Sequence, residues 1–432
     1  MRRAAQPFRP PQISILPQPT FGAVYSHSIA EAVKHPDHEH ELSLETWDGR
    51  KPKVSNSIRH DDRDFVPGRI GSGIVRAIRF PPPSKPFGSP AKLIASMRDF
   101  LLHYAQLTPE TAALLVVFAL ASWFPECIPV APVLFLLGPE GEARRVLQLL
   151  ATLCRRPALL SDLDLTAIRS LPEEMNVTLL INQRDLPKNV RKFLLASADR
   201  HFHVAQGHNC LHTCGAKAIS SRADSTNAAG VRVVLSPTTG QIPVLSDAEQ
   251  KRVFDEFQPQ LLRYRELYWW KVRNSQPDVA PSMAALRDEV CGWLAPLLDS
   301  SDLQKPVLEY FSQRGRGVVE DRLTDELCVA AEAALFFCHR ENTHAFFVGE
   351  LADRINQLLL GRHELGDLTD KKAGMLLREL GIPSRRVVKG FKISLTSAVR
   401  EQIHAVARAY RAASVMDGMA RCSHCTAQSV KH

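Results

Sequence analysis

A short turn between an apolar segment and a predicted helix holds the residues whose spacing best matches a chemical site. Residues 132–147 read PVLFLLGPEGEARRVL, an apolar strand, a Gly-Pro-Glu-Gly turn and a helix start. A phosphate-binding loop reads G-x-x-x-x-G-K-[ST]: its amides surround the phosphates, its lysine contacts the β- and γ-phosphates, and its hydroxyl binds Mg²⁺. The turn therefore predicts a place for phosphate at the N-terminus of the helix.

Three positions of this pattern hold residues with different chemistry. Ala143 replaces the second glycine, Arg144 the lysine and Arg145 the serine or threonine. Arg144 keeps a positive charge that can bind phosphate bidentately, whereas Arg145 cannot ligate Mg²⁺. The candidate nucleotide-binding residues of this segment are Gly138, Pro139, Glu140, Gly141, Glu142, Ala143, Arg144 and Arg145.

A second apolar segment predicts the strand that would complete such a site. Residues 177–181 are a buried strand, and Asn182 follows where an Asp that orders Mg²⁺ is expected. Asparagine has no charge with which to hold the cation, so Asn182 joins the candidate residues and no catalytic residue is assigned. We expect ATP or another nucleotide as the candidate ligand, no tightly bound Mg²⁺ and no efficient hydrolysis. This interpretation requires the strands near 135 and 180 to lie side by side, with the turn 138–144 at their shared end.

The elements around these motifs alternate between helix and strand patterns. Amphipathic or buried helices are predicted at 91–105, 109–123, 141–155, 188–198 and 250–270, and strands at 132–137, 159–161, 177–182, 201–204, 216–220 and 231–235. Such alternation predicts an α/β fold in which helices sandwich a parallel sheet. With the turn and its partner strand, it predicts a P-loop NTPase-like domain over residues 91–275.

Several short segments carry a resemblance to a known family. They are Phe124-Pro125-Glu126-Cys127, the run 136–141, Leu179-Leu180-Ile181-Asn182, the run 214–219 and the helix 257–265. Through them residues 91–270, and less closely 271–410, resemble P-loop ATPases related to AAA+ proteins and superfamily-three helicases. The nearer likeness is to the primase-associated helicase-like ATPases of plasmids, phages and integrated elements. The resemblance implies that the first two motifs bind ATP and Mg²⁺, that strand 216–220 is a sensor strand beside them, and that an arginine near 200 or 222 faces a neighbouring subunit.

The C-terminal part of the chain predicts a winged-helix domain over residues 325–413. Helices at 325–340, 348–360 and 369–380 precede an alternating hairpin at 384–395 with Lys389-Gly390 at its turn, and a last helix follows. A recognition helix and a basic wing would contact the bases and phosphates of DNA, although many winged helices bind protein. The candidate DNA-binding residues are Lys371, Lys372, Arg378, Arg385, Arg386, Lys389 and Lys392.

The remaining segments are expected to be an arm, a linker and a tail that bind no ligand. Residues 1–90 are rich in Pro, Arg, His and Asp, which predicts a largely disordered arm with one short strand pair at 65–80. Residues 276–324 are expected to form a helical linker. Residues 414–432 are expected to form a flexible tail. The run 35–41, HPDHEHE, is interpreted as solvated tail rather than a metal site. Alternating His and Cys at 208–214 and the pair Cys422 and Cys425 are interpreted as a hairpin with thiols and a frayed end, so we expect no zinc and no other metal.

The composition and charge of the chain indicate which partners and which cellular compartment to expect. The chain has 432 residues, a formal net charge of +8 and a pI near 9.1, an excess that suits a polyanionic partner. Nine cysteines in a chain of this length indicate reduced thiols and a cytoplasmic protein. The apolar stretch 112–137 is interrupted by Pro125 and Pro129, so we expect no membrane span, and no signal peptide is visible. Nothing in the sequence predicts the oligomeric state.

These observations leave one leading function and two alternatives. The leading hypothesis is a DNA-binding accessory or remnant of a mobile-element replication helicase, with weak or no ATP hydrolysis and with DNA and replication proteins as partners. The first alternative is an active ATPase or DNA translocase in which Arg144 replaces lysine and Asp185 or Glu140 supplies the carboxylate. The second is a transcriptional or scaffold protein whose winged helix binds another protein.

Overall fold

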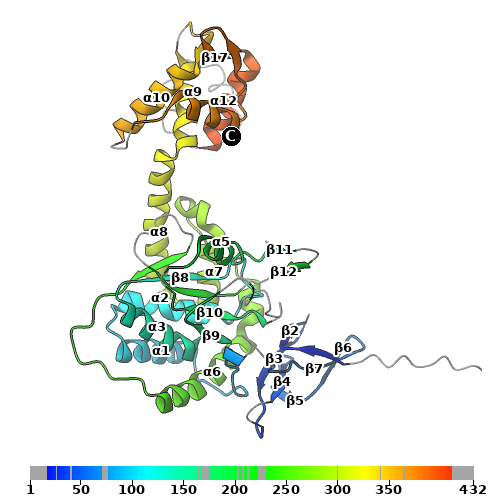
Figure 1. Cartoon of the computed structure of the whole chain (residues 1–432). Helices are drawn as coiled ribbons and strands as arrows, with labels where there is room; N and C mark the ends of the chain where they lie inside the picture. Colours follow the sequence, from blue (N-terminus) through cyan, green and yellow to red (C-terminus); the bar gives the residue numbers. More distant parts are fainter. Residues whose placement is uncertain are drawn as a thin grey trace, which may run out of the picture. The chain divides into compact units, whose positions relative to one another are not determined.

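The computed structural model describes residues 17–410, apart from short internal gaps at 26, 39–40, 71–75, 164–165, 167–174, 184, 202–203, 207–208, 212–214, 222–229, 299, 341 and 363–365. The chain divides into two compact units, residues 1–311 and 312–432 (Figure 1). Cys210 lies in the short hairpin of β11 (Val204–Gln206) and β12 (Asn209–Leu211). The other alternating positions, His208, His212 and Cys214, lie outside the described residues, as do Arg222 and the Cys422–Cys425 pair.

A five-stranded parallel sheet forms the centre of the first unit, which confirms the predicted α/β class. Its strands are β8 (Val133–Leu137), β9 (Pro157–Leu160), β10 (Thr178–Ile181), β13 (Lys217–Ser221) and β14 (Val231–Val234), in the order β14-β8-β13-β10-β9. β13 pairs with both β8 and β10, so the expectation that β8 and β10 are neighbours is wrong. All three strands are short, and β13 (KAISS) contains polar residues that are nevertheless buried, so the sequence pattern does not determine which strands pair.

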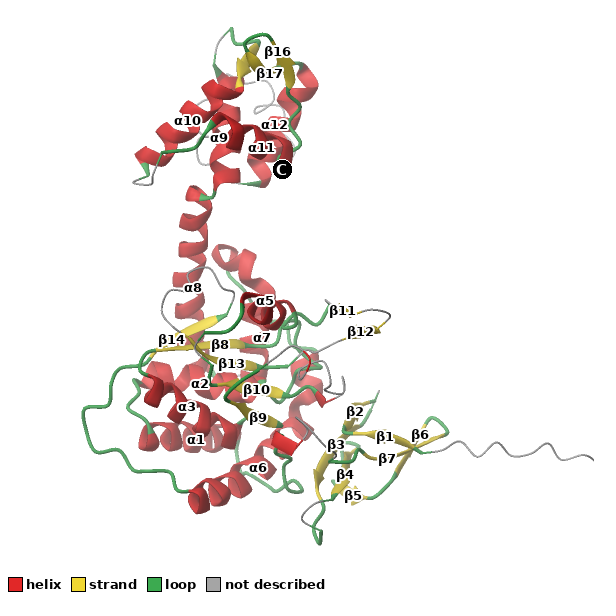
Figure 2. Cartoon of the chain, in the orientation of Figure 1, coloured by secondary structure: helices red, strands yellow, loops and turns green. Residues whose placement is uncertain are grey.

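Helices cover the sheet on both faces (Figure 2). Side chains alternate between the faces of a strand, and on β8 Leu134 and Leu136 join one core cluster while Val133 and Phe135 join another. The first cluster includes α1 (Pro90–Tyr104), α2 (Pro109–Ala121), α3 (Glu140–Leu153) and α6 (Asp247–Arg273); the second includes α5 (Lys188–Ala196). The apolar stretch 112–137 is thus divided between α2 and β8, and no helix in the described part of the chain is both long and apolar enough to cross a bilayer.

The N-terminal region differs from the expected disordered arm, because residues 18–67 form seven strands. One sheet has the order β2-β3-β4-β5 and another the order β1-β7-β6. The strands are β1 (Gln18–Thr20), β2 (Gly22–Val24), β3 (Ile29–Lys34), β4 (Leu42–Trp47), β5 (Lys53–Ser55), β6 (Ile58–His60) and β7 (Arg63–Pro67). Ala32 and Leu44 are buried in the same cluster as Phe135, so the apolar residues of this region gain their partners from distant sequence. The local composition, rich in Pro and charge, does not reveal those partners.

Short helical elements lead from the sheet unit to the second unit. They are η3 (Pro281–Leu286), α7 (Arg287–Leu294), η4 (Ala295–Leu297) and the first turns of α8 (Ser301–Thr324), which crosses the boundary between the units. Trp293 and Phe311 are buried in the same core cluster as α1–α3. Part of the predicted linker therefore belongs to the core of the first unit.

The second unit has a separate apolar core and a small sheet. Its elements are α9 (Glu326–His339), β15 (Ala345–Phe347), α10 (Val348–Gly361), α11 (Asp370–Glu379), β16 (Arg385–Val387), β17 (Gly390–Ser394) and α12 (Ser397–Ala409). The antiparallel strands have the order β15-β17-β16. Leu351, Leu377, Ile393 and Ile403 from four of these elements pack in one cluster, which fixes the base of the β16–β17 hairpin against the helices.

Candidate functional site

The predicted turn and Asn182 lie at the same edge of the central sheet. β8 ends at Leu137, and only Gly138 and Pro139 separate it from α3. Asn182 directly follows β10, and β8, β13 and β10 are parallel, so their carboxyl ends share one edge. Ligands of open α/β sheets bind at this edge. The structure therefore brings the two predicted motifs to one edge, with the end of β13 between them.

Gly138 has a structural reason to be glycine. Its φ is +140°, and a Cβ there would overlap the carbonyl oxygen of Leu235. The close approach comes from the residue after β14, where Leu235 N–H donates to the Leu137 carbonyl at 2.7 Å. By contrast, a Cβ at Gly141 would meet nothing within 4 Å. The first glycine is therefore explained by strand packing, without a phosphate.

The segment that would surround a phosphate is already part of a helix. α3 begins at Glu140, and the Ala143 amide donates to the Pro139 carbonyl at 3.1 Å. Pro139 has no N–H to offer, and Ala143 is fully buried. A phosphate-binding loop instead keeps four residues between its glycines in an open turn. Fewer amides therefore point outward here than the motif requires.

The charges of this helix start also oppose an anion. Glu140 and Glu142 lie in the first turn of α3, where they stabilise the helix dipole and would repel phosphate. Arg145 Nη1 lies 3.8 Å from Glu142 Oε2, so its charge is partly compensated, and Arg144 is exposed. Among the residues that the structure describes, none donates a hydrogen bond to the buried Asn182 Oδ1. The site thus has a cation where Mg²⁺ would bind and carboxylates where phosphate would bind.

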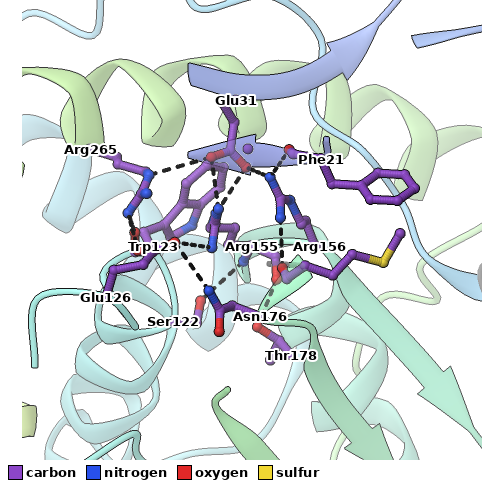
Figure 3. Close-up of polar contacts among 12 residues, drawn as sticks. Phe21, Glu31, Ser122, Trp123, Glu126, Arg155, Arg156, Asn176, Thr178 and Arg265 are labelled. Atoms are coloured by element: carbon purple, nitrogen blue, oxygen red, sulfur yellow. Dashed lines mark hydrogen bonds and ion pairs between the residues drawn. The ribbon is translucent and has the colours of Figure 1, made fainter. Parts of the chain in front are cut away.

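A buried ionic cluster, which the sequence did not predict, lies at the opposite edge of the sheet (Figure 3). Glu31 of β3 is 2.8 Å from Arg155 and 2.7 Å from Arg156, the two residues before β9. Glu126 is 3.2 Å from Arg155 and 2.9 Å from Arg265 of α6. These five side chains join the N-terminal strands to the amino end of the central sheet and to α6.

The carboxylates of the cluster stay ionised although they are buried, because the arginines lie close to them. Burial alone would raise the pKa of Glu126, but Arg155 and Arg265 outweigh this and lower it to about 2. The pKa of Glu31 is also lowered, against burial, by Arg155, Arg156 and Arg265. Burial and the neighbouring Arg155 lower the pKa of Arg156 to about 10. Three buried cations that pair with two carboxylates indicate a structural role rather than a catalytic one.

A second buried carboxylate pair connects β4 to α6. Burial and the nearby Glu45 raise the pKa of Glu266 to about 8, and the two carboxyl groups share a hydrogen bond. Glu45 also accepts a hydrogen bond from Ser84 N at 2.8 Å, and Arg263 lies 2.9 Å from Glu266. Because the pKa of Glu266 is raised to about 8, the charge of this contact depends on pH.

The β16–β17 hairpin and α11 present the predicted basic residues. Lys372 is ion-paired with Glu326, but for the other six the described residues provide no ion pair. Five of those six are exposed and Lys392 is half-buried; they are Lys371 and Arg378 on α11, Arg385 and Arg386 on β16, Lys389 in the turn and Lys392 on β17. No acidic residue occurs between Glu379 and Glu401. The hairpin therefore carries an uncompensated positive charge.

Exposed apolar side chains accompany these charges, and the sequence analysis missed them. Val388 at the hairpin turn is fully exposed, Phe391 is 44% exposed, and Met375 lies between Lys371 and Arg378 on the outer face of α11. Two adjacent valines at a predicted turn were the available evidence, since a solvent-facing turn is usually polar. Apolar groups beside basic ones are typical of surfaces that bind a partner.

Comparison with known proteins provides little further evidence. No protein-family model matches the chain, and no curated protein matches it in sequence. Among solved structures, the apo A form of the NrS-1 C-terminal region, residues 305–718, aligns with 85% of this chain and 96% of its own. The identity is 9% and the TM-score 0.34. A similarity this low supports no argument about function.

Proposed function

We propose that this chain is a DNA-binding protein whose second unit is a winged-helix domain, and that its α/β unit is a P-loop-type fold without efficient ATP hydrolysis. One observation carries the proposal. Arg385, Arg386 and Lys389 are exposed on one hairpin, and the described residues provide no ion pair for them. Uncompensated cations on a projecting hairpin suit the phosphate backbone of DNA.

The element order of the second unit supports the winged-helix assignment. Three helices, α9, α10 and α11, precede the β16–β17 hairpin, and the short strand β15 completes the sheet (Figure 2). On α11, Lys371, Met375 and Arg378 follow the i, i+4, i+7 spacing and share one face. We assign α11 to the DNA groove and the hairpin to the adjacent phosphates. Lys372 contributes less, because Glu326 already pairs with it.

The direct pairing of β8 with β10 that this interpretation required is absent, so the support for a P-loop-type first unit comes from the carboxyl edge that the two parallel strands share. One strand, β13, separates the strand that leads into the turn from the strand that ends at Asn182. A shared edge of this kind is evidence of fold alone and not of activity. The helical turn at Glu140, the ion pair of Arg145 and the missing carboxylate at position 182 argue against hydrolysis. An accessory role beside replication proteins of mobile elements is the setting we propose, on the sequence resemblance.

A binding titration with two matched variants tests the DNA proposal. The hairpin variant replaces Arg385, Arg386, Lys389 and Lys392 with alanine. The control replaces Arg50, Lys51, Lys53 and Arg63, which are exposed in and between the N-terminal strands, and removes the same charge. We expect fluorescence anisotropy with labelled duplex DNA to show a large loss of affinity for the hairpin variant only. Equal losses, or none, would show that the hairpin does not bind DNA.

Restoring the motif residues tests the assignment of the α/β unit. Arg144→Lys, Arg145→Thr and Asn182→Asp together recreate the lysine, the hydroxyl and the carboxylate. We expect no Mg²⁺-dependent ATP turnover in either the natural chain or this triple variant, because the segment after Gly138 remains helical. Steady-state phosphate release measures this. Turnover by the natural chain that Arg144→Ala abolishes would establish the active-ATPase alternative instead.

A further inference from the structure

Two histidines and a glutamate converge on the turn between β3 and β4. The ligand atoms of His35, His38 and Glu41 all lie within 4.8 Å of one another. From the sequence, this run was expected to be a solvated tail. The structure instead places it between strands whose apolar side chains are buried, and Lys34 pairs with Leu42 at the base of the turn.

Backbone hydrogen bonds hold the turn in this conformation. His35 N–H donates to the Glu41 carbonyl at 2.9 Å, and Glu41 N–H donates to the His38 carbonyl at 3.1 Å. The two imidazole rings lie 4.6 Å apart between centroids. The backbone therefore already brings the three side chains together, and binding an ion would require only small rotations.

The donor atoms suit a metal of a particular class. Imidazole nitrogen and carboxylate oxygen together are typical ligands of zinc and neighbouring divalent transition metals, at about 2.0–2.2 Å from the ion. The Asp37 amide donates to His35 Nδ1 at 3.1 Å, so this nitrogen is an acceptor in the metal-free protein, and an ion bound to it would replace the amide as its partner. A neutral imidazole is the form that binds metal.

We propose that His35, His38 and Glu41 bind one divalent transition-metal ion of the zinc class, with water at the remaining position. His35 is half-buried while His38 and Glu41 are exposed, so the bound ion would exchange with solvent. Because both flanking strands pack into the first unit, the bound ion stabilises that unit. The site is independent of DNA binding and of the β8–α3 turn.

Metal titration of the full chain tests the proposal. Cys422→Ser and Cys425→Ser form the background, so that this CxxC pair contributes no thiolate. Two double variants are made in this background. The site variant carries His35→Gln and His38→Gln, and the control variant carries His103→Gln and His344→Gln, two exposed histidines elsewhere in the chain. We expect calorimetric titration with ZnCl₂ to show one fewer bound equivalent for the first pair, and no change for the second. Glu41→Gln alone should weaken binding at least tenfold, and circular dichroism without metal verifies that each variant is folded.

Spectroscopy and stability provide two further results. Co²⁺ in the same background should give absorption from nitrogen and oxygen ligands without a thiolate charge-transfer band, and the His35/His38 variant should lose it. Zinc should raise the unfolding temperature of the background and not of that variant. The proposal is overturned if the His35/His38 variant binds as many zinc ions with the same affinity, or if binding to the background does not saturate.

Discussion

At the scale of single residues, two carboxylates on the N-terminal strands meet opposite electrostatic surroundings. Glu31 lies among Arg155, Arg156 and Arg265 and stays ionised, whereas Glu45 lies against Glu266, which keeps a proton. Both contacts attach these strands to the α/β unit, but they respond to pH in opposite directions.

The Glu45–Glu266 pair predicts a loss of stability at alkaline pH. The folded pKa of Glu266, about 8, exceeds its ordinary value of 4.5, so its stabilising contribution is complete below 4.5 and is lost as the pH rises through 8. Glu266→Gln keeps a hydrogen-bond donor without a charge. We expect this variant to be more stable than the natural chain at pH 8.5, on the order of a few kcal/mol, with a smaller difference at pH 5.

Urea unfolding at the two pH values measures the difference. Glu256→Gln is the control on the same helix, because Glu256 is exposed and pairs only with Arg252 among the residues described. An advantage of Glu266→Gln that is equal at both pH values would contradict the raised pKa of Glu266.

The Glu31 cluster predicts a large effect of removing one anion. Glu31→Gln leaves Arg155, Arg156 and Arg265 buried, with Glu126 as the remaining carboxylate of the cluster as the structure describes it. Breaking a buried ion pair on one side costs about 3–5 kcal/mol, and we expect a loss of this size in the free energy of unfolding of the first unit. Denaturant titration followed by tryptophan fluorescence measures it. A loss below about 1 kcal/mol would show that solvent reaches the cluster.

At the scale of elements, the two glycines of the β8–α3 turn have different roles. A Cβ at Gly138 would overlap the Leu235 carbonyl, while Gly141 lies in the first turn of α3 with open space around it. A motif that relied on both glycines for phosphate would make both substitutions harmful. The structure predicts that only the first one is.

Alanine substitutions test this difference. We expect Gly138→Ala to destabilise the first unit by at least about 1–3 kcal/mol, because its φ of +140° is strained for any side chain. Gly141→Ala should be neutral or stabilise by up to about 1 kcal/mol, since alanine favours helix. Thermal unfolding of both variants measures these changes. Strong destabilisation by Gly141→Ala would indicate that the turn is not helical as described.

The sequence predicted elements better than their pairing. The apolar runs of β8 and β10 and the amphipathic patterns of α1 and α6 follow from local periodicity. The helix start was predicted at residue 141, one residue from Glu140, where the structure begins it. The absence of an open loop before it could not be predicted, because a Gly-Pro-Glu-Gly sequence is compatible with both an open loop and a helix start. The exposed Val388 and Phe391 were likewise missed, since their exposure depends on where the sheet of the second unit ends.

At the scale of the whole molecule, long-range contacts determine what the sequence could not. Glu31 and Arg265 meet across most of the first unit, and neither residue type predicts burial. The apolar residues of the N-terminal strands are likewise buried against residues distant in the sequence. A local composition typical of disorder was therefore misleading. The basic residues of the second unit were predictable because four of them lie on one local hairpin.

The central claim is that the second unit contacts DNA phosphates through this hairpin. Its most direct test is the dependence of DNA affinity on salt for the natural chain and the Arg385/Arg386/Lys389/Lys392 alanine variant. Each lost phosphate contact lowers the slope of log affinity against log salt by about 0.9. We predict a slope smaller by roughly 2–4 for the variant, as some of the four contact phosphates. Identical slopes would contradict the account.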